Sequence, residues 1–258
     1  MRMRFFSLVA VLLLIVACGC TETHIPTPQW MGKAPSFNAD PGAVLSYFEG
    51  IPYRNDGAIN RFGDFTLFAD QERRFEKPGL NCSGFVVAAS RYFFKHNYML
   101  SNVTFDRLGD SGKDALNGQD WDFGYDLILN ITEGMNRKVV LPFGETADID
   151  GSNGMTLRGF GLHDKKAWKD VIASMHPGKI YLFSMSKPVK FKNYNLLYYH
   201  VGLIVPDKKG HLWLCHATTK AGVNKVDITQ FGKLENIIEA NPDTELGPRK
   251  ILIIETAL

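Results

Sequence analysis

The 258-residue sequence has little net charge, few cysteines and no internal repeat. Its 29 basic and 27 acidic side chains leave a formal net charge of +2, which gives a polyanionic partner no electrostatic support. Hydrophobic residues make up 45% of the chain and charged residues 22%, proportions that argue against a disordered, collagen-like or coiled-coil protein. The composition and length predict a globular protein with one large or two small domains.

A long apolar run stands at the N-terminus. Arg2 and Arg4 precede 13 mostly apolar residues, 5–17, that include no acid. This pattern is typical of a secretory signal peptide, and the run is shorter than the ~20 residues of a membrane-spanning helix. Removing residues 1–17 leaves 27 basic and 27 acidic side chains, so we expect a neutral mature chain that binds no nucleic acid.

The apolar run ends in Ile15-Val16-Ala17-Cys18, which resembles the lipobox of bacterial lipoproteins. The resemblance implies that Cys18 becomes the first residue of the mature protein and carries lipid. We therefore predict a signal peptide over 1–17, a lipidated tether over 18–37, and a folded domain over 38–258 at a membrane of the bacterial cell envelope. An uncleaved anchor, or a plain secretion signal that ends near a cysteine, remains an alternative.

The four cysteines are Cys18, Cys20, Cys82 and Cys215. If Cys18 is acylated, three are left in an oxidising compartment, and three thiols cannot all pair. At least one free thiol is expected. No spacing of histidines, cysteines and acids indicates a metal site, and no cofactor is expected.

Helical patterns come first along the chain and strand patterns last. Asp40-Pro41 predicts a helix start, and Gly50 its end. The further expected helices are 83–97, 121–137 and 164–175, with a short helix near 70–76 inside a long loop at 50–81. The expected strands are 179–186, 197–205, 211–217, 223–228 and 249–256. This order predicts an α+β fold with an antiparallel sheet.

Two histidines lie on the predicted hairpin at 197–217. With a symmetric five-residue turn over 206–210, Val205 faces His211, and His200 then lies directly opposite His216. Such a pair allows one imidazole to orient the other, although two unrelated strand histidines would give the same pattern. In this register Cys215 points to the other face of the sheet and is expected to be a buried structural thiol.

Cys82 stands where a loop meets the start of the predicted 83–97 helix. The helix dipole and free backbone N–H groups at that position stabilise a thiolate and can hold an oxyanion. A nearby imidazole would complete a cysteine nucleophile. The alternative is a small apolar side chain at a helix start.

Several short motifs resemble the NlpC-type cell-wall peptidases, a papain-like family. They are Asn81-Cys82-Ser83-Gly84-Phe85-Val86, Tyr199-His200-Val201-Gly202-Leu203, His216-Ala217, the strand start Pro177-Gly178-Lys179, and Gly50-Ile51-Pro52-Tyr53. The resemblance covers about 43–97 and 177–228. It implies a papain-like α+β fold in which the nucleophile begins a helix packed on an antiparallel sheet.

By this resemblance Cys82 is the nucleophile, His200 the general base and His216 the orienting residue, while Tyr53, Ser83 and Gly84 support or bind substrate. The implied activity is hydrolysis of amide bonds in peptidoglycan stem peptides, often the γ-D-glutamyl–diaminopimelate bond.

Three features depart from the family pattern. Asn81 and Lys179 replace the usual acids, and 118 positions separate Cys82 from His200, which predicts an insertion at about 98–176 that could cap the groove. Two other readings stay open: a papain-like amidase or acyltransferase acting on another amide or lipid substrate, and a catalytically silent envelope-binding lipoprotein.

The lipobox resemblance makes a direct prediction. Radiolabelled palmitate fed to a bacterial host that expresses the full chain should enter the protein, and Cys18→Ser should abolish the incorporation. Label that persists in Cys18→Ser, or a mature form without lipid, would contradict the anchor.

Overall fold

The computed structural model describes residues 32–36, 39–109, 120–191 and 194–258. The predicted signal peptide, the predicted lipidation site Cys18 and most of the predicted tether lie outside these ranges. Among the residues described, no helix has the length and apolar character needed to cross a bilayer.

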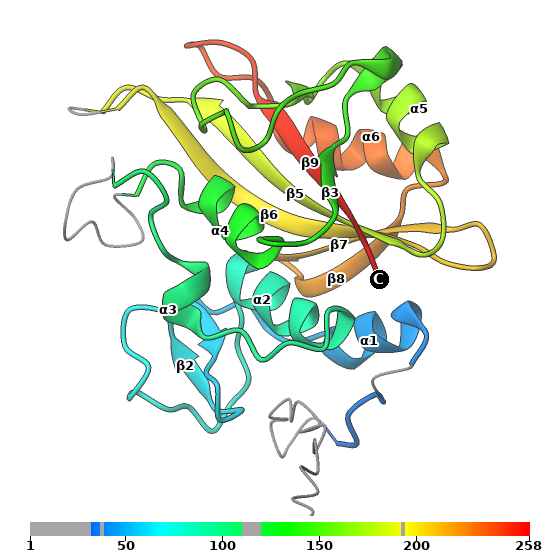
Figure 1. The fold of residues 1–258 in the computed structure, drawn as a ribbon. Helices are drawn as coiled ribbons and strands as arrows, with labels where there is room; N and C mark the ends of the chain where they lie inside the picture. The colour runs from blue at the N-terminus through cyan, green and yellow to red at the C-terminus, as the bar shows by residue number, and fades with distance from the viewer. Residues whose placement is uncertain (1–31, 37–38, 110–119, 192–193) are drawn as a thin grey trace, which may run out of the picture.

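An antiparallel sheet forms the centre of the molecule (Figure 1). Its strand order is β3-β9-β5-β6-β7-β8, and β4 pairs with β9 beside this path. The strands are β3 (Arg137–Val139), β4 (Phe160–Gly161), β5 (Lys179–Pro188), β6 (Leu196–Pro206), β7 (Leu212–Thr218), β8 (Gly222–Asp227) and β9 (Lys250–Ala257). The mixed α+β class and the antiparallel pairing predicted from the sequence are confirmed.

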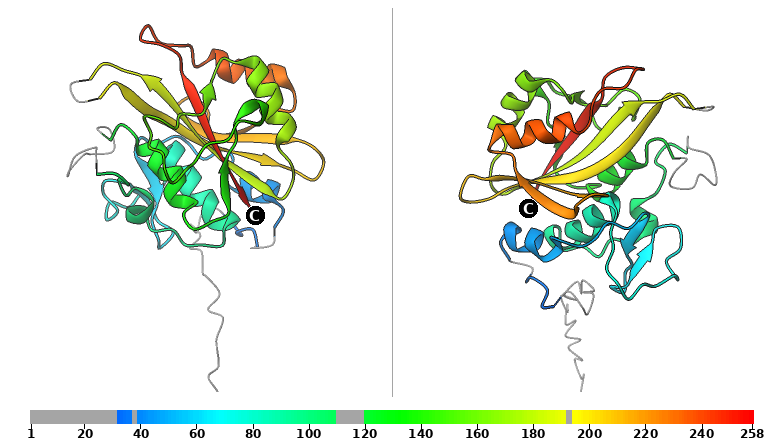
Figure 2. Two further views of the ribbon diagram at one scale, coloured as in Figure 1. Left: turned by 45° about the horizontal axis from the view of Figure 1, so that its top comes forward. Right: turned by 180° about the vertical axis from the view of Figure 1, so that it is seen from behind.

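Helices cover both faces of the sheet (Figure 2). They are α1 (Pro41–Phe48), α2 (Cys82–Phe93), α3 (Leu100–Val103), α4 (Phe123–Ile131), α5 (Lys165–Ser174) and α6 (Phe231–Glu239), with a 3-10 turn η2 at Pro142–Gly144. Buried side chains of α1, α2 and α4 form one core with Val201 and Leu203 of β6. Those of α5 and α6 form a second core with Phe183 and Ile204 on the opposite face.

Two helix starts follow the capping pattern in the sequence. The Asp40 carboxylate accepts the backbone N–H of Gly42 at 3.0 Å, and Pro41 is the first residue of α1. Asp164 accepts the N–H groups of two residues at the start of α5. The helix expected over 121–137 is shorter because Gly134 has a left-handed φ of +72° and the chain then joins the sheet as β3.

The predicted helix near 70–76 is wrong. The segment 50–81 instead contains a hairpin, β1 (Gly57–Ile59) with β2 (Phe65–Leu67). Phe75 donates its backbone N–H to Phe65 at 2.8 Å, and the guanidinium of Arg54 lies 3.7 Å from the centre of the Phe75 ring. Backbone pairing with β2 therefore prevents residues around Phe75 from forming helical hydrogen bonds.

A buried arginine joins this hairpin to α2. The guanidinium of Arg91 donates to the backbone carbonyls of Ile59, Asn60 and Tyr98 at 2.7–3.1 Å. Burial lowers the pKa of Arg91 to about 10, so the side chain remains charged at neutral pH. These bonds fix the hairpin against the helix that begins at Cys82.

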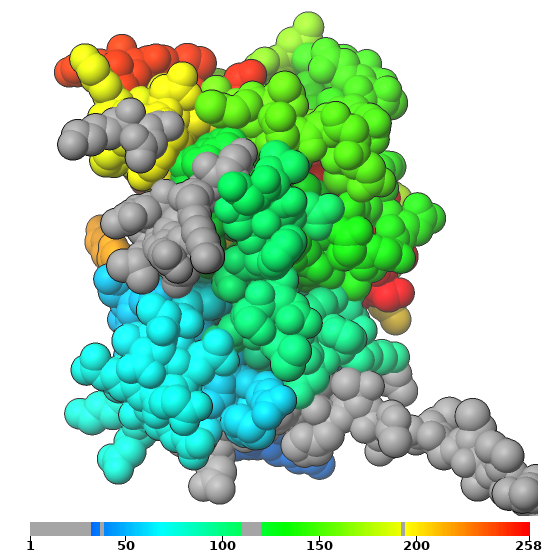
Figure 3. Space-filling model, turned by 60° about the vertical axis from the view of Figure 1, so that its left-hand side comes forward, coloured from blue at the N-terminus to red at the C-terminus, as the bar shows by residue number. Residues whose placement is uncertain are grey.

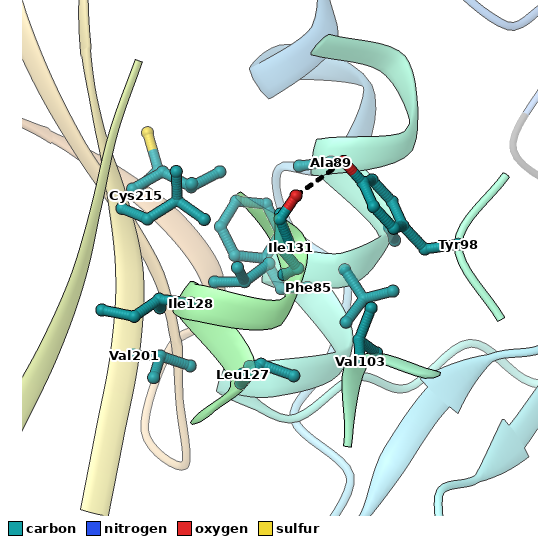
Figure 4. Packing of buried hydrophobic residues seen from close by; sticks show 14 of the residues in the cluster. Phe85, Ala89, Tyr98, Val103, Leu127, Ile128, Ile131, Val201 and Cys215 are labelled. Carbon is teal, nitrogen blue, oxygen red and sulfur yellow. Dashed lines mark hydrogen bonds between the residues drawn. The ribbon is translucent and has the colours of Figure 1, made fainter. Parts of the chain in front are cut away.

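The segment 98–176 contributes to both cores. It supplies α3, α4, β3, β4 and α5, and α4 packs on β5, β6 and α2. Figure 4 shows Phe85 of α2, Ile128 of α4 and Val201 of β6 in one cluster, where the Tyr98 hydroxyl donates to the carbonyl of Ile131 at 2.9 Å. Figure 3 shows the segment (green) forming much of the surface above the β1–β2 region (cyan).

The first turn of α2 lies against the backbone of β1. A Cβ atom on Gly84 would be 2.0 Å from the carbonyl oxygen of Gly57, and Asn81 donates its N–H to that same oxygen at 3.0 Å. Since a real Cβ cannot come so close to a backbone atom, glycine is required at this position for α2 to begin where it does.

We predict that Gly84→Ala destabilises the protein by about 1–3 kcal/mol because α2 and β1 must move apart. Urea unfolding of the soluble domain measures the difference. Gly232→Ala in α6 is the matched control, since nothing lies within 4 Å of a Cβ there, and it should stabilise by up to about 1 kcal/mol. Equal stability of the two variants would contradict the close approach.

Candidate active site

The β6–β7 hairpin carries the two histidines, but not in the predicted register. Val205 pairs with Trp213, not with His211, so the register is displaced by two residues. The turn is the reason: Asp207 donates its N–H to the His211 carbonyl, and its carboxylate accepts the N–H groups of Lys209 and His211. These bonds close a three-residue loop at 208–210, in which Gly210 has a φ of +88°.

The two histidines still lie together, because a displacement of two residues keeps both side chains on the same face. His200 Nε2 lies 2.9 Å from His216 Nδ1, and the two rings meet edge to face with centroids 5.0 Å apart. They are therefore diagonal neighbours rather than direct cross-strand partners. The expectation that one imidazole could orient the other survives the correction of the register.

Cys82 lies where the pairing of β6 with β7 has ended. The paired residues run from Pro206↔Leu212 to Leu203↔Cys215, although both strands continue further. The Cys82 thiol receives a hydrogen bond from the backbone N–H of Val201, next to His200 in β6. The Val201 N–H, which has no partner in β7, thus holds the Cys82 thiol beside β6, the strand that carries His200.

The start of α2 surrounds the thiol with donors. The Asn81 side chain caps the helix by accepting the N–H of Gly84 at 2.7 Å. Cys82 Sγ lies 4.0 Å from Ser83 Oγ, and the backbone N–H groups of Cys82 and Ser83 lower the pKa of the thiol. Asn caps a helix as well as Asp does, so Asn81, in place of the acid found in the NlpC-type motif that it resembles, costs no helix stability.

Burial dominates the electrostatics of the site. It raises the pKa of the Cys82 thiol above its ordinary value, while the hydrogen bonds from Val201 and Ser83 oppose the rise. It lowers the pKa of His200 to about 4, and together with the neighbouring His200 it lowers that of His216 to about 3. At neutral pH the groups rest as a thiol and two uncharged imidazoles, contrary to the thiolate expected from the helix dipole.

The hydrogen bond between the histidines leaves one ring nitrogen for chemistry. Because His200 Nε2 is used in the contact with His216, Nδ1 is the ring nitrogen of His200 that is left to accept a proton. This requires His200 to donate through Nε2–H to the lone pair on His216 Nδ1. If His216 accepts this hydrogen bond, it holds His200 in the tautomer in which Nδ1 can act as a base.

The supporting residues have distinct roles. Tyr53 forms a bridge with Leu80 and lines the cavities on both sides of Cys82. Burial and the nearby Cys82 raise the pKa of its hydroxyl. Ser83 is buried and contacts the sulfur, whereas Gly84 acts through packing against β1.

Two cavities meet at Cys82. The helix-side cavity, of about 450 Å³, is lined by Asn81, Ser83, Asp56, Asp120 and Phe123 among others. The histidine-side cavity, of about 890 Å³, is lined by His216, the β7–β8 turn and α6. Both include Tyr53, Cys82, Tyr199 and His200. Asp120 and Phe123 come from the segment 98–176, so this segment forms a wall of the site.

Sequence reasoning missed Tyr199 and the part of the site that α6 supplies. Tyr199 lies at the bulge where the β5–β6 register shifts, and its hydroxyl donates to Asn241 Oδ1 at 3.1 Å. Its ring stacks beside His200, and the Arg249 guanidinium lies 4.8 Å from its centre. An aromatic residue next to the candidate base was the available signal.

Two other groups lie outside the two cavities. Cys215 is 1% exposed in the core on the α2 face, as predicted for a structural thiol. Carboxylate oxygens of Asp106, Asp122 and Asp126 lie within 4.8 Å of one another near the start of α4. Burial raises the pKa of Asp126 to about 7.

No family model and no curated protein matches the chain. One solved structure, described as a "putative xylanase" from Bacteroides fragilis, aligns with 82% of this chain and 99% of its own length. The aligned sequences are 15% identical and the TM-score is 0.35, a similarity too low to support an argument about activity.

The lowered pKa of His200 predicts the acidic limb of the pH–rate profile. A histidine with the ordinary pKa of about 6.5 is nine-tenths protonated one pH unit below it and cannot act as a base. Since the pKa of His200 is about 4, kcat/KM for a peptide amide should fall only as the pH approaches that value. An acidic limb at pH 6–7 would contradict the buried, uncharged state of His200.

Proposed function

We propose that the protein is a papain-like cysteine hydrolase of the NlpC type that cleaves amide bonds in peptidoglycan stem peptides. The observation that carries the proposal is Cys82 at the start of α2, in a cavity shared with a His200–His216 pair joined at 2.9 Å. The order of the motifs along the chain supports the family, and the γ-D-glutamyl–diaminopimelate bond is the preferred target.

The reaction begins with proton transfer. His200 Nδ1 takes the thiol proton while Cys82 Sγ attacks the carbonyl carbon of the amide. The oxygen of that carbonyl becomes an oxyanion, which the N–H groups of Cys82 and Ser83 stabilise. The raised pKa of the thiol and the lowered pKa of His200 make a neutral pair the ground state, so charge develops only during attack.

The second half of the reaction restores the enzyme. His200 gives its proton to the leaving nitrogen, and the C–N bond breaks to leave a thioester on Cys82. Water then attacks the thioester, His200 accepts the proton of the water, and the new carboxylic acid leaves as the thiol is reprotonated. His216 keeps His200 in the tautomer that both steps need.

The lipid anchor gives this activity its location. A chain exported by the signal over 1–17 and acylated at Cys18 would hold the domain at a membrane of the cell envelope, within reach of the wall. The net charge near zero agrees with a peptide substrate and with the absence of a nucleic-acid partner.

Substitutions of Cys82, His200 and His216 separate the roles of the three side chains. Cys82→Ala and His200→Ala should each abolish hydrolysis, because they remove the nucleophile and the base. His216→Ala should lower kcat/KM by about 10²–10⁴-fold, the size of a general acid–base contribution, and His216→Gln should recover part of it. Mass spectrometry of the fragments released from one defined stem peptide gives kcat/KM for all four variants.

Cys215→Ser is the matched control for the thiol, since it changes a buried cysteine outside both cavities. Its rate should stay within a few-fold of the unsubstituted protein. Release of fragments at an unchanged rate by Cys82→Ala, or full activity in His216→Ala, would refute the mechanism.

A further inference from the structure

The two cavities that meet at Cys82 carry opposite charge. Among the residues that the structure describes, the helix-side cavity is lined by Asp56 and Asp120 and by no lysine or arginine. The histidine-side cavity is lined by Lys220 and Lys233 and by no aspartate or glutamate. A substrate that crosses the thiol therefore meets an acidic surface on one side and a basic surface on the other.

The two lysines come from different elements. Lys220 lies in the turn between β7 and β8, and Lys233 lies in the first turn of α6. Both are exposed, and neither makes an ion pair or a side-chain hydrogen bond within the described ranges. Lys225, by contrast, is held by Glu49 at 2.9 Å and by Ser46. The charges of Lys220 and Lys233 are thus available to a ligand in the cavity.

The surroundings favour an anion that also makes hydrogen bonds. Thr218, Thr219 and Asn236 line the same cavity, together with the apolar side chains of Val226 and Ile237. Hydroxyl and amide groups can donate to carboxylate oxygens, while the apolar surface suits the aliphatic part of an amino acid. A planar carboxylate on a short aliphatic chain fits this combination.

We propose that Lys220 and Lys233 form a carboxylate-binding subsite for the leaving-group side of the substrate. The inference rests on the proposed function. His200, which protonates the departing nitrogen, lines both cavities, whereas its partner His216 lines only this one, so we place the leaving group on the side of the histidine pair. The leaving residue is then one with free carboxylates, a requirement that diaminopimelate meets with two and lysine with one.

Two tripeptides test the subsite by hydrolysis. Both are L-alanyl-γ-D-glutamyl-diaminopimelate, with the diaminopimelate carboxyls free in one and converted to carboxamides in the other. Exposed ion pairs are weak, so the two lysines together should lower KM for the free acid by about 3–30-fold with little change in kcat. The preference should shrink in high salt.

The double variant Lys220→Met/Lys233→Met should lose this preference and keep kcat for the carboxamide. Lys208→Met is the matched control, because Lys208 is an exposed lysine in the β6–β7 turn that lines neither cavity. It removes a positive charge and should keep the full preference. A preference that survives in the double variant, or is lost in Lys208→Met, overturns the subsite.

Binding measured without turnover separates this inference from the proposed hydrolysis. Calorimetric titration of Cys82→Ala with each tripeptide should give a Kd about 3–30-fold lower for the free acid, and the lysine variants in that background should remove the difference. If the unsubstituted protein cleaves neither tripeptide but this difference persists, the hydrolysis fails and the subsite stands. Equal binding, or none, overturns the subsite even if both peptides are cleaved.

Discussion

The site depends on the contact between the first turn of α2 and the backbone of β1. Gly84 allows α2 to begin against the Gly57 carbonyl, and the Asn81 side chain caps the N-terminus of α2. That position brings Cys82 to the end of the β6–β7 pairing. The Val201 N–H has no partner in β7 there and donates a hydrogen bond to the Cys82 sulfur. The proposed nucleophile is therefore placed by backbone geometry in two elements that are distant in sequence.

Burial determines how such a site can work. An exposed helix start would favour a thiolate, but here desolvation raises the pKa of Cys82 and lowers that of His200. Proton transfer must accompany attack, so the alignment of His200 matters more than a preformed charge. Tyr199 and His216 both contact His200, and Tyr199 is held in turn by Asn241, which links the proposed base to the segment after α6.

The sequence predicts β5 to β9 to within about two residues, together with the helices that have clear caps, such as the one starting at Pro41, but it does not predict the short strands β1 to β4. The hairpin register could not be predicted, because the Asp207 side chain closes a shorter loop than composition suggests. The helix α6 was missed although Phe231, Leu234, Ile237 and Ile238 follow a helical spacing, and these side chains pack in the second core. The motifs predicted that Cys82 and His200 lie in one site. They could not predict the cavity walls formed by 98–176 and α6, because these walls depend on tertiary packing.

Trapping the acyl-enzyme tests the central claim most directly. Protein mixed with the stem peptide and quenched in acid during turnover should gain the mass of the acyl part of the peptide, in a hydroxylamine-sensitive bond that peptide mapping places on Cys82. An adduct on Cys215, or consumption of the peptide with no covalent adduct at any cysteine, would contradict the assignment of Cys82 as the nucleophile.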